Sequence, residues 1–148
     1  MANDEYLLDT NVLVYATLAD DPRHVTACAL LRGQTAGQRA AAFVSVQNLA
    51  EMWPALTGPR TVPPDSPEVA ERKIAAIASL PHVTVLPVDR ETVRIATRLA
   101  RELGVTRQRY FDIQIAAVML QHGIRRLYTE NARDFQGIDG VEAINPFA

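Results

Sequence analysis

The 148-residue sequence has little of several features that mark particular protein classes. Its single cysteine, Cys28, can form neither an internal disulfide nor a cysteine zinc site, which suits a reducing cytosol. It has one lysine, Lys73, and a formal net charge of -2, so overall charge does not indicate nucleic-acid binding, although it leaves room for a local basic patch. No apolar run is long enough to span a membrane, and the polar start MANDEY does not resemble a signal peptide. We therefore expect a soluble cytoplasmic protein, with no membrane partner and a single domain over residues 1–148.

Short apolar runs alternate with helical patterns along the chain. The runs predict strands over residues 6–8, 41–46, 83–88, 126–129 and 141–144. The helical patterns cover residues 12–18, 24–31, 47–56, 68–80, 90–103 and 110–121. This alternation predicts an α/β fold with a mainly parallel sheet of about five strands, covered by helices on both faces.

Helical spacing also predicts which side chains these helices bury. In helix 24–31 the predicted apolar side is Val25, Cys28, Ala29 and Leu31, and in helix 47–56 it is Leu49, Ala50, Trp53 and Leu56. Helix 110–121 is apolar nearly all round, which is typical of a buried helix. The segment 58–67 contains four prolines and is predicted to be a mobile loop, either a lid or a surface for a partner.

Four acidic residues follow or neighbour the carboxyl ends of predicted strands: Asp9, Glu51, Asp112 and Asp134. A parallel sheet brings those strand ends to one edge, where ligands bind in open α/β sheets. Two carboxylates about 5 Å apart repel by roughly 3 kcal/mol at an effective dielectric constant near 20, so a cluster of them needs a cation. Oxygen ligands without Cys or His suit Mg²⁺ or Mn²⁺ better than Zn²⁺.

Each of these acids also has an ordinary structural alternative. Asp9 could be no more than the N-cap of the following helix. Asp112 could be no more than a first-turn acid that is stabilised by the helix dipole. Glu51 could be an exposed surface residue, and Asp134 could simply hold its turn together. The histidines show no ligand spacing, no serine has a recognisable base, and there is no glycine-rich phosphate loop.

Four segments, in order and at characteristic spacings, resemble the PIN-domain family and in particular its VapC-type toxins. They are LLDTNVLVY, SVQNLAEMW, YFDIQIAAVMLQHGIRRLYTENARDF and the short closing strand. The resemblance spans nearly the whole chain. It implies a three-layer α/β/α sandwich and a Mg²⁺-dependent endoribonuclease, with Mn²⁺ as a substitute. It also implies a homodimer that acts on RNA and is silenced by a cognate antitoxin protein.

The resemblance also implies roles for individual residues. Asp9, Glu51, Asp112 and Asp134 match the catalytic acids, and Asp9, Asp112 and Asp134 would hold the metal. Asn11, Thr129 and Asn131 would support the site. Glu130 departs from the basic or neutral residue more usual there, which could weaken phosphate binding. Basic residues that flank the motifs are candidate RNA contacts, although each could equally be a surface ion-pair partner: Arg107, Arg109, Arg126 and Arg133.

Three other functions compete with this hypothesis. A haloacid-dehalogenase-type phosphatase would need a second Asp in place of Asn11 and a later lysine, and Lys73 is badly placed for that role. A receiver-type signalling domain fails for want of the same lysine. A PIN-like module that binds RNA or a partner without cleaving it is compatible with the sequence, although the complete carboxylate set argues against it.

Overall fold

The computed structural model describes residues 5–35 and 38–148. Its main sheet is parallel throughout and has the strand order β5-β4-β1-β6-β7. The strands are β1 (Tyr6–Leu8), β4 (Ala42–Ser45), β5 (Val83–Leu86), β6 (Arg126–Tyr128) and β7 (Glu142–Ile144). A small antiparallel pair, β2 (Gln34–Thr35) with β3 (Gln38–Arg39), lies outside it. The predicted α/β class with a five-stranded parallel sheet is confirmed.

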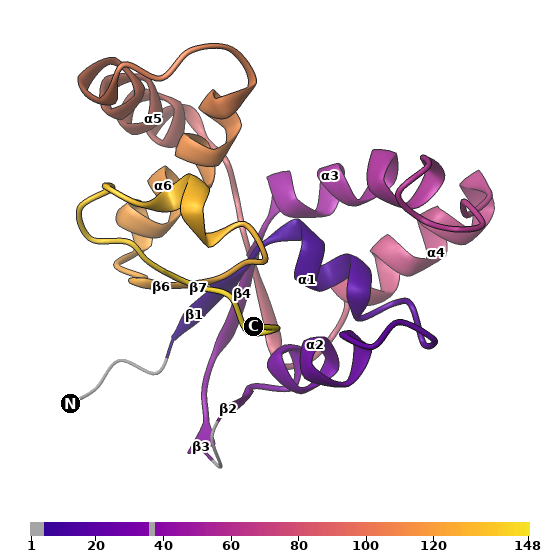
Figure 1. The fold of residues 1–148 in the computed structure, drawn as a ribbon. Helices are drawn as coiled ribbons and strands as arrows, with labels where there is room; N and C mark the ends of the chain where they lie inside the picture. Colours follow the sequence, from indigo (N-terminus) through magenta and orange to yellow (C-terminus); the bar gives the residue numbers. More distant parts are fainter. Residues whose placement is uncertain (1–4, 36–37) are drawn as a thin grey trace.

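Helices cover both faces of this sheet, as Figure 1 shows. One face carries α1 (Thr10–Tyr15), α2 (His24–Leu31), α3 (Val46–Thr57) and α4 (Pro67–Ala78). The other carries α5 (Arg90–Leu103) and α6 (Tyr110–His122), together with the 3₁₀ turns η1 (Arg107–Arg109) and η2 (Ala132–Phe135). The predicted layers are therefore present. Within the described ranges, no helix is long and apolar enough to cross a membrane.

The central strand β1 supplies side chains to both cores. Tyr6 and Leu8 belong to the core beneath α1–α4, whereas Leu7 belongs to the core beneath α5 and α6. All three are fully buried, because successive side chains of a strand point to opposite faces and both faces are covered. Burying each contributes about 1.5–3 kcal/mol, so this short strand is firmly fixed in the sheet.

The predicted buried faces of two helices are confirmed only in part, because Leu31 and Leu56 are buried as expected but Val25 and Trp53 are exposed. In α3 the buried residues include Asn48, Met52 and Leu56, while Trp53 is 42% exposed. The apolar spacing failed to predict the whole buried face of α3, because the buried face of this helix begins with two polar residues, Gln47 and Asn48. In α2 the structure buries Ala27, Leu30 and Leu31 and leaves Val25 77% exposed, since this short helix is apolar on nearly every side.

Two further expectations hold only in part. Helix α6 buries most of its apolar residues, but Phe111 and Leu120 are exposed. The proline-rich segment 58–67 is anchored to the domain at two points. Thr61 is buried and its hydroxyl donates to the Ala55 carbonyl oxygen at 2.9 Å, and Asp65 pairs with Lys73 at 2.8 Å.

One edge of the sheet collects the polar residues. β1 runs directly into Asp9, β4 ends at Ser45, and β6 is followed by Thr129. Helix α6 is joined by a short connection to the amino end of β6, so its own first turn lies at the opposite, carboxyl edge. The chain order reverses between β1 and β6, and crevices at such reversals are where α/β sheets bind ligands.

Candidate active site

Asp9 is the most buried acid of this edge, at 7% exposure. It caps α1, since its Oδ1 accepts the Thr10 amide at 2.8 Å, and its Oδ2 accepts the Thr129 hydroxyl at 2.7 Å. Burial raises the pKa of Asp9, and these hydrogen bonds only partly oppose that rise. A carboxylate held in this way is more than a helix cap, because the cap uses only one of its two oxygens.

Asn48, in the first turn of α3, holds the Asp9 side chain in place. Its side chain is fully buried, and its Nδ2 lies 3.3 Å from Asp9 Oδ1 and 3.2 Å from Thr10 Oγ1. Its Oδ1 accepts the Ser45 amide at 3.1 Å, and the Asn48 amide donates to the Ser45 hydroxyl oxygen at 3.1 Å, which together form the capping box of α3. The sequence analysis missed Asn48, and the signal was a polar residue at a capping-box position on the inward face of α3.

Glu51 lies one turn further along α3 and is half-buried. Its Oε1 accepts the Thr10 hydroxyl at 3.1 Å. Burial raises the pKa of Glu51, and the nearby charge of Asp9 raises it further. These contacts connect Glu51 to the site, which is not the behaviour of an isolated surface glutamate.

Asp112 stands in the first turn of α6 and shows that the four acids converge. Its pKa is raised to about 6, first by burial and then by the charges of Asp9, Asp134 and Glu51. Arg109 acts in the opposite direction and lowers it. Each of the other three carboxylates is therefore close enough to Asp112 to disfavour its ionisation.

Asp134 is carried by η2, immediately after the turn that follows β6. The Asp134 amide donates to the Asn131 carbonyl oxygen at 3.0 Å, so the two residues are one tight turn apart and share a face. Phe135, which is 1% exposed, anchors the turn in the core. The charge of Asp134 raises the pKa of Asp9 as well as that of Asp112, which places this carboxylate toward the site.

Asn11 and Thr129 hold the two loops of the site together. The Asn11 Nδ2 donates to Thr129 Oγ1 at 3.4 Å, and its Oδ1 accepts the Glu130 amide at 3.1 Å. Thr129 Oγ1 also accepts the Asn131 amide at 3.0 Å. Since the Thr129 hydroxyl donates to Asp9, these contacts connect the turn after β6 to the carboxylate after β1.

The Glu130 side chain is engaged elsewhere. Its carboxylate accepts Arg23 Nη1 at 2.7 Å and the Tyr15 hydroxyl, and the Arg23 guanidinium lies 3.9 Å from the Tyr15 ring centre. Arg23 also pairs with Asp21 at 2.8 Å. Glu130 therefore belongs to a surface cluster between α1 and α2. Its negative charge, which is unusual at this position of the family, is neutralised by Arg23.

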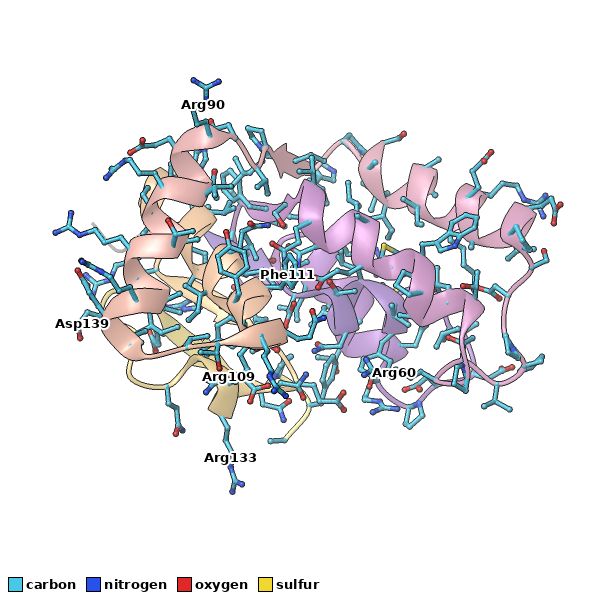
Figure 2. All side chains as sticks on the ribbon, turned by 90° about the horizontal axis from the view of Figure 1, so that it is seen from above. Arg60, Arg90, Arg109, Phe111, Arg133 and Asp139 are labelled. Carbon is cyan, nitrogen blue, oxygen red and sulfur yellow. The ribbon has the colours of Figure 1, made fainter. Side chains whose placement is uncertain are left out.

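The four candidate arginines occupy different places. Arg109 lies nearest the acids, and its Nη2 donates to the Asp134 carbonyl oxygen at 3.4 Å. Arg107 is exposed at a positive φ of 58°, and Arg133 extends outward from the molecule in Figure 2. Arg126 is the first residue of β6, so it sits toward the amino edge of the sheet, away from Asp9. Its position does not favour contact with a substrate at the carboxyl edge.

The donor set fits a hard divalent cation. It consists of carboxylate oxygens. Burial and the charges of the other three carboxylates raise the pKa of Asp112, and the charge of Arg109 lowers it. In the part of the chain that the structure describes, no three His, Cys, Asp or Glu side chains stand together as a closed metal-binding group. Binding a cation there would thus require rotation of the half-buried or exposed side chains of Asp112 and Asp134, because Asp9 is fixed by its hydrogen bonds.

Comparison with known proteins defines the class. The PIN-domain family model matches residues 6–141. Ribonuclease VapC24 of Mycobacterium tuberculosis is 33% identical over 138 residues, which cover 86% of this chain and 87% of that protein. The chain therefore belongs to the PIN-domain family and, within it, to the VapC-type ribonucleases of toxin–antitoxin systems.

Solved structures share the fold. The crystal structure of VapC20 of Mycobacterium tuberculosis, a sarcin-ricin-loop-cleaving toxin, superposes with a TM-score of 0.68 at 24% identity and covers 93% of this chain and 98% of its own. A toxin–antitoxin complex from Klebsiella pneumoniae gives a TM-score of 0.63 at 18% identity, covering 96% and 98%. At these identities the superpositions establish the fold alone.

Proposed function

We propose that this VapC-type ribonuclease toxin is a divalent-metal-dependent endoribonuclease whose site is formed by Asp9, Glu51, Asp112 and Asp134. The observation that carries this proposal is the gathering of acids at one edge of the sheet. Asp9 and Glu51 both accept hydrogen bonds from Thr10. Burial, together with the charges of Asp9, Asp134 and Glu51, raises the pKa of Asp112 to about 6. One acid at the end of a strand can be explained as a helix cap. Four acids at one edge of the sheet repel each other, and this repulsion lowers the stability of the metal-free protein. That cost is explained by a cation that they bind together.

Asp9, Asp112 and Asp134 would hold Mg²⁺, or Mn²⁺ in its place. When bound, the metal would supply Lewis-acid polarisation of the scissile phosphate and a bound water of lowered pKa. Thr129 and Asn48 keep the Asp9 carboxylate oriented through their hydrogen bonds. Glu51 and Asp112 are the two candidates for accepting a proton from the attacking water, since burial raises the pKa of both.

Substrate binding would depend on a local basic group, because the net charge is -2. Arg109 is the first candidate for an RNA phosphate contact, as it borders Asp112 and Asp134. Arg107 and Arg133 are exposed beside the same two motifs and are further candidates.

Lys73 pairs with Asp65 in the proline-rich segment, so it is not available to a phosphatase or receiver site.

The metal requirement is the direct test. We expect the purified protein, freed of any antitoxin, to cleave RNA in the presence of Mg²⁺ or Mn²⁺ and to stop in excess EDTA. Thiol reagents should leave cleavage intact, because Cys28 lies outside the site, where its sulfur contacts His24 and the Ala16 carbonyl oxygen. Mg²⁺ at about 100 times its Kd should also stabilise the fold by roughly 2.7 kcal/mol. Cleavage that survives exhaustive chelation would contradict the metal mechanism, whereas metal binding without cleavage would favour a non-cleaving module.

A cognate antitoxin and a homodimer complete the proposal. Similar proteins have been crystallised in toxin–antitoxin complexes. We expect a small protein encoded beside this chain to co-purify with it and to inhibit its ribonuclease activity. Expression of the chain alone should stop growth, and Asp9→Asn should abolish that toxicity. Equal growth with the wild type and Asp9→Asn would contradict a toxin role.

A further inference from the structure

Phe111 is an exposed aromatic residue that is adjacent in sequence to Asp112 of the candidate site. It directly precedes Asp112 in the first turn of α6 and is 44% exposed. Figure 2, a view from above Figure 1, shows it near the middle of the molecule, between α6 and α3. Single exposed aromatic residues are common on protein surfaces, so exposure alone assigns Phe111 no role, and its contacts must be considered.

Hydrogen bonds fix Phe111 relative to the acids. Gln47 of α3 donates to the Phe111 carbonyl oxygen at 2.9 Å, and Gln114 of α6 donates to Gln47 Oε1 at 2.7 Å. The Gln47 side chain also hydrogen-bonds Glu51 and lowers its pKa. Gln47 is 9% exposed, so this bridge between α3 and α6 is shielded from water. The backbone of Phe111 is thereby held at a set place beside Glu51 and Asp112.

The ring itself is also supported. Tyr110 meets it edge to face, with ring centres 5.3 Å apart and an angle of 78°, and the Tyr110 hydroxyl donates to Gln114 at 2.9 Å. Such a pair restrains the orientation of the Phe111 ring while part of its surface stays exposed. The exposed Arg109 guanidinium lies two residues earlier, beside Asp134.

We propose that Phe111 is a stacking platform for an unpaired nucleobase of the RNA, next to the scissile phosphate. The inference rests on the proposed ribonuclease function and adds a residue, outside the four acids, that contacts the substrate. A restrained aromatic face binds single-stranded nucleic acid by stacking, and it accepts any base because every base has a π-face. The base must be unpaired, since bases inside a helix already stack on each other.

Cleavage kinetics on a single-stranded oligoribonucleotide of mixed sequence test this proposal. Phe111→Leu keeps an apolar side chain but removes the ring, and we expect it to raise KM by roughly 5- to 100-fold with kcat little changed. Phe111→Tyr and Phe111→Trp should retain a KM within about threefold of the wild type, because they keep a π-face. Trp53→Leu is the matched control, as Trp53 is equally exposed but lies on α3 and has no contact with the acids among the described residues. It should leave KM unchanged.

A binding measurement separates this proposal from the cleavage mechanism. In the Asp9→Asn background, a fluorescent adenine analogue is placed at successive positions of the same oligoribonucleotide. One position should be quenched on binding, and the quenching should disappear in Phe111→Leu and when the strand is annealed to its complement. An unchanged KM and unchanged quenching in Phe111→Leu would overturn the proposal even if cleavage is metal-dependent. A loss of dimer mass in Phe111→Leu, measured by light scattering, would also overturn it and assign the ring to a contact between copies.

Discussion

Asp112→Asn is expected to abolish RNA cleavage while raising the melting temperature of the metal-free protein. The two effects have opposite signs because the Asp112 charge would help to hold the metal but is repelled by Asp9, Asp134 and Glu51 when no metal is bound. Removing a member of a cooperative catalytic group typically costs about 10⁴-fold or more in kcat. The stability gain is far smaller, about 1 kcal/mol, because Asp112 is half-exposed and solvent screens the repulsion.

The pH dependence of the melting temperature tests the role of Asp112 in a second way. The pKa of Asp112 is about 6 in the folded protein, against an ordinary value of 3.8. Between these values the folded state binds more protons than the unfolded state, so the free energy of unfolding falls as the pH rises through this window. In EDTA, the wild type should therefore melt at a higher temperature near pH 5 than near pH 7. Asp112→Asn should remove part of that difference, since asparagine does not titrate.

Asp139→Asn is the matched control for both measurements. Asp139 is exposed and lies at the periphery in Figure 2, away from Phe111 and the neighbouring Asp112. We expect this variant to keep wild-type cleavage and a wild-type pH profile. If Asp112→Asn melted clearly below the wild type in EDTA and still cleaved RNA, Asp112 would be a first-turn residue that serves the helix dipole, and the proposed site would be wrong.

The second large effect is expected in the turn after β6. At limiting Mg²⁺, Asp134→Asn should cost far more activity than Glu130→Gln, with Asn131→Ala between them. Asp134 can supply a charged ligand, and its charge already acts on Asp9 and Asp112. Asn131 offers only a neutral oxygen, and Glu130 is occupied by Arg23 and Tyr15. We expect a loss of two or more orders of magnitude for Asp134→Asn, about 10-fold for Asn131→Ala, and less for Glu130→Gln.

Stability measurements distinguish the roles within this turn. Glu130→Gln should lower the free energy of unfolding by at most about 1 kcal/mol, because the Arg23–Glu130 pair is partly exposed. Arg23→Gln should have a similar effect, and the double variant should cost less than the sum of the two single variants. Cleavage losses that are greatest for Glu130→Gln would instead place Glu130 at the metal.

The sequence by itself determined the fold class and the order of the acids. An apolar strand ending in Asp9, strands alternating with helices, and a buried helix opening at Asp112 follow from local patterns of polarity, which depend on neighbours along the chain. Parallel strands place their carboxyl ends at one edge, so convergence of the four acids could be expected without coordinates.

Only the tertiary structure decided which polar residues serve the site and which apolar residues remain outside. Asn48 and Gln47 lie on the inward face of α3 because that face meets Asp9 and α6, so polar burial is satisfied by partners far away in the sequence. Trp53 and Phe111, both apolar and on the same two helices, are left partly in solvent. Glu130 is removed from the site by Arg23, a contact across more than a hundred residues that no local pattern contains.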